Sequence, residues 1–284
     1  MKLLRYGPAG EEKPGLLDED GRIRDLSDKI TDINGAALAP DRLAALAKLD
    51  TASLPLVEGS PRLGPPVAGI GKIIAVGINY AAHGKETKID IPDEPILFTK
   101  AVTSLNGPND PVILPKGSKK GDWEVELAIV IGRRAQYVEQ ADAMDVIAGF
   151  AVINDVSERA LQLEGSGQWL KGKSFDTFAP FGPWLVTPDE VPDPQNLNLW
   201  LEVNGERHQD GNTSAMIFGI TYLVSSISEY MTLMPGDVIP TGTPPGVGLG
   251  HEPPIFLQPG DVMRLGVEGL GEQRQEVRAW EDKG

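Results

Sequence analysis

Residues 124–132 read Glu124-Val125-Glu126-Leu127-Ala128-Ile129-Val130-Ile131-Gly132, an apolar and largely β-branched run with two acids at its start. A run of this kind without a polar break is typical of a strand that is covered on both faces. Side chains alternate along a strand, so Glu124 and Glu126 share one face. Two neighbouring carboxylates in a covered site must share a proton or meet a cation, because burial of an unpaired charge is costly. The alternative is a frayed strand start with both acids in water.

A second predicted strand, over residues 150–154, ends in Asp155 and is followed by a polar, helix-compatible run. An acid at the C-terminal end of a strand lies at the mouth of a sheet, where functional groups gather. Glu124, Glu126 and Asp155 are therefore candidates for one three-carboxylate cluster. All-oxygen ligands suit a hard divalent ion such as Mg²⁺, Mn²⁺ or Ca²⁺, and three carboxylates leave coordination positions for water or substrate.

The composition excludes several classes of protein. A chain of 284 residues with 33 glycines and 24 prolines indicates one large strand-rich domain with many turns, with or without a small appendage. Its formal net charge of -15 argues against a nucleic-acid partner. No cysteine occurs, which excludes disulfides, thiolate nucleophiles, iron–sulfur clusters and the usual structural zinc sites.

Several simpler assignments find no support. The three histidines lie far apart in the sequence, so we do not expect a multi-histidine metal centre. The start of the chain lacks the apolar stretch of a signal peptide and no later run approaches a membrane span, so we expect a cytoplasmic protein without a membrane partner. The glycine-rich residues 246–250 open no helix, which indicates a loop and not a nucleotide-binding motif.

Two regions of the chain differ in whether they contain candidate catalytic residues. Residues 1–70 are expected to form a small β-rich domain with a structural or dimer-packing role, since no chemical constellation occurs there. Residues 71–284 are expected to form a metal-dependent catalytic domain. In this second region His83 and Glu86 fall on a short polar segment, and their spacing of three places both on one face of a helical turn. The elements that we expect are strands over residues 2–6, 72–80 and 95–100, hairpins over 14–25, around Asn204-Gly205 and from 259 onward, and helices over 41–49 and 217–234.

Six stretches in order resemble the fumarylacetoacetate hydrolase family, in which a small N-terminal part precedes a metal-binding catalytic domain. The resemblance implies a mixed α/β, strand-rich fold whose catalytic domain is a β-sandwich roll, assembled as a homodimer or tetramer. It spans residues 71–280 and is carried by Gly77-Ile78-Asn79-Tyr80-Ala81-Ala82-His83-Gly84-Lys85-Glu86, Pro95-Ile96-Leu97-Phe98-Thr99-Lys100, Glu124-Val125-Glu126-Leu127, Asn154-Asp155-Val156-Ser157-Glu158-Arg159, Lys173-Ser174-Phe175 and Thr241-Gly242-Thr243-Pro244.

The resemblance also implies the residues of a site. Glu124, Glu126 and Asp155 would hold Mg²⁺ or Mn²⁺, while His83 and Glu86 would form the dyad that handles the proton and the water. The remaining residues that it implies are Lys173 beside the metal and Lys100, Arg159, Gln162 and Thr243 in the substrate pocket.

The family covers hydrolysis of 2,4-diketo acids, decarboxylation of oxaloacetate-like acids, isomerisation of hydroxydienedioates and lyase activity on ureidoglycolate-like substrates, all on small 2-oxo or 2-hydroxy acids. Retention of both His83 and Glu86 favours hydrolysis, because an oriented histidine can deprotonate a water that attacks the C4 carbonyl. We therefore expect cleavage of the C3–C4 bond of a 2,4-diketo acid to pyruvate and a carboxylic acid. The layout of the N-terminal part most resembles bacterial members that act on 2,4-diketo-3-deoxy sugar acids, such as the rhamnonate or fuconate derivatives, to give pyruvate and lactate.

Two other classes stay open from the sequence. A lyase, isomerase or decarboxylase on the same scaffold would turn over substrate without consuming water. A non-catalytic protein would use its ion, such as Ca²⁺, only to hold strands together, so chelation would abolish its stability and no turnover would be seen at all.

Overall fold

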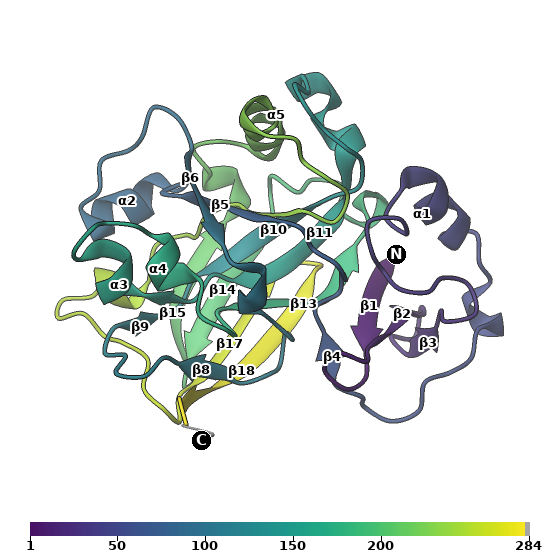
Figure 1. The fold of residues 1–284 in the computed structure, drawn as a ribbon, viewed down its shortest axis with the longest axis horizontal. Coiled ribbons are helices and arrows are strands. Elements are labelled where there is room, and N and C mark those ends of the chain that lie inside the picture. The colour runs from purple at the N-terminus through teal and green to yellow at the C-terminus, as the bar shows by residue number, and fades with distance from the viewer. Residues whose placement is uncertain (282–284) are drawn as a thin grey trace.

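The computed structural model describes residues 1–281 and shows a strand-rich α/β protein built around one large mixed sheet (Figure 1). This sheet has eleven strands, of which β4 (Leu63–Gly64) pairs with β1 and β7 (Leu105–Asn106) pairs with β13. The other strands follow one another in the order β3 (Ile23–Asp25), β2 (Lys13–Leu17), β1 (Lys2–Tyr6), β13 (Ala179–Val186), β11 (Ile147–Asn154), β10 (Val125–Ile131), β16 (Val238–Pro240), β5 (Ile73–Gly77) and β6 (Ile96–Lys100). The predicted mixed α/β, strand-rich fold class is confirmed.

A second sheet of five strands shares a core with the first. Its order is β15 (Glu206–Asn212), β14 (Asn198–Val203), β17 (Val262–Val267), β18 (Gly271–Ala279) and β8 (Val112–Leu114). Buried and more exposed residues alternate along β14, as in a strand with one face on the core. Leu199 and Leu201 of β14 belong to the same hydrophobic cluster as Leu127 and Ile129 of β10. The two sheets therefore pack face to face.

Strand β10 lies inside the large sheet, and all seven of its residues are buried. It pairs antiparallel with β11 on one side and with β16 on the other. Leu127 and Ile129 enter the core between the sheets, whereas Ala128 and Val130 enter a second core on the opposite face. The prediction of a strand that is covered on both faces is confirmed.

The N-terminal part extends the large sheet instead of forming a sheet of its own. Strand β1 pairs antiparallel with β13, with Lys2 opposite Val186. Leu3 and Leu16 pack in one hydrophobic cluster with Val130 and Phe181 of the large sheet. Figure 1 shows β1 to β4 and α1 together at one side of the molecule, and they share a core with the rest of the chain. The division into a domain over residues 1–70 and a second over 71–284 stays a prediction.

The helices are short and lie at the rims of the sheets. In the described part of the chain, none of them has the length and apolar character that a bilayer crossing requires. The predicted helix over residues 217–234 is α5, and it ends at Tyr230 because Leu233 forms a backbone bridge with Ala135. The helices are α1 (Pro40–Leu46), α2 (Ala81–Thr87), α3 (Arg159–Leu163), α4 (Leu170–Lys173) and α5 (Ile220–Tyr230), with 3-10 turns η1 (Thr51–Ser53), η2 (Val102–Ser104), η3 (Gln140–Val146), η4 (Pro188–Glu190), η5 (Thr213–Ala215) and η6 (Gly248–Gly250).

Candidate active site

The three predicted carboxylates meet at one end of β10 and β11. The antiparallel register places Val125 opposite Asn154, so Glu124 lies opposite Asp155, whose N–H donates to the Glu124 carbonyl at 2.9 Å. One carboxylate oxygen from each of Glu124, Glu126 and Asp155 lies within 4.8 Å of the others, and all three residues are buried. The alternative of a frayed strand start with its acids in water does not describe this structure.

The charges of these carboxylates are unequal. Burial alone raises the pKa of Glu124, but the Lys173 ammonium and the Arg159 guanidinium bring it down to about 2. Burial and the neighbouring Asp155 and Glu124 charges hold the pKa of Glu126 well above its ordinary value, although the Gly242 N–H donates to Glu126 Oε2 at 2.8 Å. Burial thus favours the protonated form of Glu126, and a bound cation would favour its charged form. Three buried carboxylates at this spacing are an all-oxygen donor set that suits a hard divalent ion such as Mg²⁺ or Mn²⁺.

Lys173, at the end of α4, contacts the carboxylate cluster directly. Its Nζ donates to Glu124 Oε2 and to Asp155 Oδ2, both at 2.8 Å. Burial alone would lower the pKa of Lys173, but the Asp155 and Glu124 charges raise it above its ordinary value. The ammonium therefore stays charged and offsets part of the negative charge of the carboxylates.

Lys100, the last residue of β6, contacts the carboxylate cluster from a buried position. Its Nζ donates to Asp155 Oδ1 at 2.5 Å and to the Val156 carbonyl at 3.2 Å. Lys100 therefore helps to orient Asp155, and its predicted contact with substrate stays a prediction.

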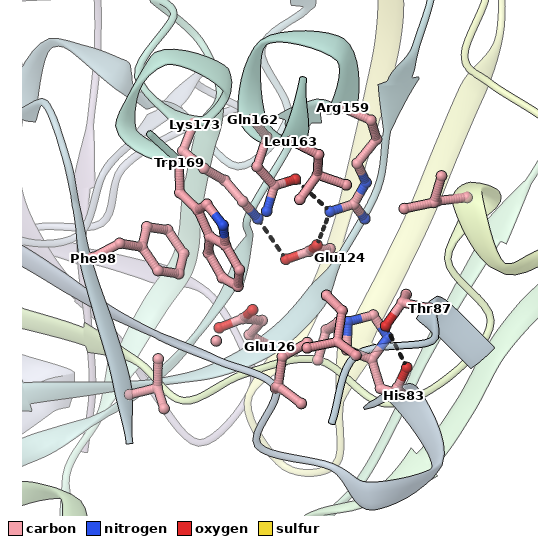
Figure 2. A pocket seen from close by; sticks show the side chains of 16 residues that line it. His83, Thr87, Phe98, Glu124, Glu126, Arg159, Gln162, Leu163, Trp169 and Lys173 are labelled. Atoms are coloured by element: carbon pink, nitrogen blue, oxygen red, sulfur yellow. Dashed lines mark hydrogen bonds and ion pairs between the residues drawn. The ribbon is translucent and has the colours of Figure 1, made fainter. Parts of the chain in front are cut away.

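Arg159, the first residue of α3, lies beside Glu124 and Gln162 in the wall of the pocket (Figure 2). Its Nε donates to Asp122 Oδ2 at 2.8 Å, and its Nη1 reaches Glu124 Oε1 at 2.7 Å and Gln162 Oε1 at 2.9 Å. Its Nη2 is buried and has no hydrogen-bond partner. An unpaired buried guanidinium nitrogen is costly, so this donor marks a position for an anionic or carbonyl ligand.

His83 lies on α2, across the pocket from Lys173 and Arg159 (Figure 2), and Glu86 lies on the same helix. His83 Nδ1 and Glu86 Oε1 are 2.8 Å apart, and the N–H of Gly246 donates to Glu86 Oε2 at 2.9 Å. With Glu86 accepting the Nδ1 proton, the tautomer assigned to His83 leaves Nε2 free as a base. The predicted spacing on one face of a helical turn is confirmed.

One pocket joins these groups. Apolar side chains form much of its wall, and the edge-to-face pair of Phe98 and Trp169, with ring centroids 5.3 Å apart, lies beside Lys173 (Figure 2). Thr243 also lines the pocket, but its hydroxyl donates to the Val125 carbonyl at 2.8 Å and so also fixes β10. The lining residues are Val76, Gly77, Ile78, His83, Thr87, Ile89, Phe98, Glu124, Glu126, Arg159, Gln162, Leu163, Trp169, Lys173, Thr243 and Leu249.

Sequence reasoning missed two contributors to this site. A Cβ on Gly77 would lie 2.3 Å from the Trp169 ring, so a glycine is needed where this indole crosses β5. Asp122 is fully buried behind Arg159 and was overlooked because it precedes the predicted strand. The signal that could have found it is a third acid, two residues before Glu124, next to an apolar tryptophan.

The comparisons with known proteins agree with this geometry. Residues 72–278 match the family described as "Fumarylacetoacetate (FAA) hydrolase C-terminal". A Burkholderia lata protein, named only in general terms as a hydrolase, is 58% identical over 279 residues, which cover 98% of this chain and 99% of that protein.

Two solved structures define the range of chemistry among similar proteins. Maleylpyruvate hydrolase from Sphingobium sp. SYK-6, in complex with a manganese(II) ion and pyruvate, is 30% identical with a TM-score of 0.83, over 99% of this chain and 100% of that one. The 2-hydroxyhepta-2,4-diene-1,7-dioate isomerase from Mycobacterium marinum is 34% identical with a TM-score of 0.74, over 98% of each chain.

Proposed function

The chain belongs to the fumarylacetoacetate hydrolase family, and from this we propose that it is a Mg²⁺- or Mn²⁺-dependent hydrolase that cleaves a 2,4-diketo acid to pyruvate and a carboxylic acid. The observation that carries the proposal is the buried His83, which pairs with Glu86 and lines one pocket with Glu124 and Glu126 of the carboxylate cluster. The complex of the Sphingobium enzyme with manganese and pyruvate supports the choice of metal and product.

Different residues of the pocket have different roles in the proposed reaction. The two free donors, Arg159 Nη2 and the amide of Gln162, are placed to bind the substrate carboxylate. A bound divalent ion would supply Lewis-acid stabilisation to the 2-oxo group and to the enolate that forms from it. His83 Nε2 accepts a proton from a water that adds to the C4 carbonyl, while Glu86 stabilises the resulting imidazolium.

The balance of atoms is that of a hydrolysis. The oxygen of the water bonds to C4, the C3–C4 bond breaks, and its electron pair goes to C3 as the enolate of pyruvate. A proton equivalent to the one taken by His83 ends on C3, so that one water yields one carboxylic acid and pyruvate. A site that excludes solvent favours this series of reaction steps, because it protects the enolate until C3 is protonated.

The charge of the buried cluster fits a monoanionic substrate. Four buried carboxylates face three buried cations, so a divalent ion and one 2-oxo acid monoanion would bring the whole group to neutrality. The carboxylates are Asp122, Glu124, Glu126 and Asp155, and the cations are Lys100, Arg159 and Lys173.

An isomerase is the second candidate, because the Mycobacterium marinum isomerase resembles this chain about as closely as the Sphingobium hydrolase does. Isomerisation moves protons but consumes no water. The His83–Glu86 pair favours the hydrolase, since an oriented histidine base is what the activation of water requires. An ion that only holds strands together would leave the orphan Arg159 Nη2 in this pocket without a purpose.

The chemical group at the C4 end of the substrate is a finer part of the proposal. The sequence prediction of a 2,4-diketo-3-deoxy sugar acid such as the L-rhamnonate derivative, with lactate as second product, stays a prediction. The wall formed by Ile78, Ile89, Leu163, Trp169 and Leu249 offers few hydrogen-bond partners to a polyhydroxylated tail, so acylpyruvates with short alkyl tails belong in the same panel. Cytoplasmic location and assembly as a homodimer or tetramer likewise stay predictions, the latter to be measured by light scattering.

The test is pyruvate release from acylpyruvates, from the sugar-derived diketo acids and from oxaloacetate, with Mn²⁺ and with chelator. We expect metal-dependent release of pyruvate from at least one diketo acid, with incorporation of one ¹⁸O atom from labelled water into the carboxylic acid. His83→Ala should abolish this release. Turnover of a dienedioate without label, or decarboxylation that survives in His83→Ala, would refute the hydrolase.

A further inference from the structure

Asp122, the second residue of β9 (Gly121–Asp122), lies at the centre of a buried hydrogen-bond system that the proposed reaction does not use directly. Its Oδ2 accepts from Arg159 Nε at 2.8 Å and from the N–H of Leu249 at 2.9 Å. Its Oδ1 accepts from the N–H of Gly248 at 2.7 Å and from that of Trp123 at 2.8 Å. All four donors stay fixed to one carboxylate that water does not reach.

The loop over residues 246–250 connects this carboxylate to the catalytic dyad. At one end Gly248 and Leu249 donate to Asp122, and at the other the N–H of Gly246 donates to Glu86. The loop is packed too closely to shift on its own. A Cβ on Gly248 would lie 2.1 Å from the Ile255 carbonyl oxygen, and one on Gly250 would lie 2.8 Å from Glu86 Cδ.

A second link runs through the tryptophan that follows Asp122. The Trp123 indole N–H donates to the Gly246 carbonyl at 3.1 Å, so both polar groups of the Gly246 backbone are engaged by the site. Leu249, whose N–H is held by Asp122, also forms part of the pocket wall. The orientation of Arg159, the pocket wall and the position of Glu86 therefore all depend on one side chain.

We propose that Asp122 is a positioning residue that couples the substrate-binding Arg159 to the His83–Glu86 dyad through the loop over residues 246–250. This proposal rests on the proposed function, because Arg159 Nη2 matters only if it binds the substrate. Asp122 does not line the pocket itself. It neutralises Arg159 and accepts from the loop whose Gly246 N–H supports Glu86, so binding and water activation are set by a common partner.

A matched control exists at the opposite end of β10. Asp237 is also fully buried, accepts from the N–H of Met234 at 2.7 Å and pairs with Lys72 Nζ at 2.5 Å. Its backbone carbonyl accepts from the N–H of Ile131, at the end of β10 remote from Glu124. Asp237→Asn thus removes a buried, ion-paired charge without touching the pocket, although Asp237 Oδ1, unlike the oxygens of Asp122, has no hydrogen-bond partner.

The experiment compares Asp122→Asn with Asp237→Asn in the full chain loaded with Mn²⁺. The readouts are kcat and KM for an acylpyruvate, the Kd of pyruvate by calorimetry and the melting temperature. We expect Asp122→Asn to raise KM and the pyruvate Kd by roughly 10- to 100-fold and to lower kcat by roughly tenfold, which is the range for loss of a charged buried hydrogen bond. Asp237→Asn should lose stability with kcat and KM within about twofold of the wild type.

A double-mutant cycle separates positioning from general damage. If Asp122 acts through Arg159, then Asp122→Asn adds less than about twofold to KM in an Arg159→Lys background. Full additivity of the two substitutions would overturn the proposal. So would an Asp122→Asn variant that loses stability like Asp237→Asn but keeps the wild-type kcat, KM and pyruvate Kd.

Two further measurements keep the proposal testable. Hydrogen exchange of a peptide over residues 246–250 should quicken in Asp122→Asn and not in Asp237→Asn, and unchanged protection would overturn the link to Glu86. If Asp122→Asn does not fold, Asp122→Glu keeps the charge and displaces Arg159, and a folded variant with wild-type constants would equally refute the idea. If the wild type releases no pyruvate from any diketo acid, the proposed function fails, while the calorimetric Kd of pyruvate still reports on Asp122.

Discussion

Replacement of Lys173 by methionine should have opposite effects on stability and on metal binding. The buried Lys173 ammonium makes two contacts of 2.8 Å, one with Glu124 and one with Asp155, and a methionine of similar length would leave both carboxylates without this cation. Removing one partner of a buried ion pair costs roughly 3–5 kcal/mol. In chelator, we therefore expect the melting temperature to fall on the order of 10 °C.

Metal should reverse much of this loss. Loss of one positive charge a few ångströms from the triad favours a divalent ion by about 2 kcal/mol even at the dielectric constant of water, so Mn²⁺ should bind on the order of tenfold more tightly. The variant should nevertheless lose turnover, because Lys173 no longer lies beside the substrate site. Calorimetric titration with Mn²⁺ at pH 8 and thermal scans with and without the metal measure both effects.

The control is Lys72→Met, which breaks the Lys72–Asp237 pair of 2.5 Å away from the triad. This variant should show the same loss of melting temperature in chelator and in Mn²⁺. An equal loss in both conditions for Lys173→Met, or weaker Mn²⁺ binding than in the wild type, would refute the electrostatic reasoning for the triad.

Three further predictions follow from the site. The pKa of Glu126 is raised in the metal-free protein, so metal must displace its proton: Mn²⁺ affinity should increase as pH rises, with proton release in calorimetry, and a pH-independent affinity would contradict this. Glu86→Gln should lower kcat by roughly 10²- to 10⁴-fold in steady-state kinetics with little change in Mn²⁺ affinity, since only the orientation and charge of His83 are affected. Gly77→Ala should displace Trp169, because the new Cβ would lie 2.3 Å from its ring. We expect a higher KM in the same assay and a less ordered Trp169 side chain in a crystal structure. An unchanged KM would count against a role of this indole in the pocket.

The sequence alone was enough for the strands and for the triad. Val125–Ile131 has the unbroken apolar pattern of a doubly covered strand, and period-two alternation then forces Glu124 and Glu126 to one side. Asp155 was found because an apolar strand ends on it. The spacing of His83 and Glu86 placed both on one face of a helical turn, but the family resemblance supplied their roles and added Lys173, since a lysine or a histidine near a loop has the same local signature at the surface.

The sequence could not give positions that depend on partners distant in the chain. Lys100 ends β6, which lies next to β5, and its ammonium contacts Asp155. The helix over residues 217–234 was expected to be longer because its apolar periodicity continues, whereas a backbone bridge between Leu233 and Ala135 ends it at Tyr230. For this helix a contact distant in sequence overrides the local preference.

The amino-acid sequence by itself determined the buried strands, the existence of a carboxylate cluster and its preference for a hard cation, because these follow from side-chain period and from the cost of burying charge. Only the tertiary structure decided which cations neutralise the cluster, that Arg159 Nη2 has no hydrogen-bond partner, and that Asp122 and Glu86 both accept hydrogen bonds from the same loop. Those facts depend on residues from β6, β9, α2, α3, α4 and the loop over residues 246–250 meeting in space, and the packing of separate elements leaves no periodic trace in the chain.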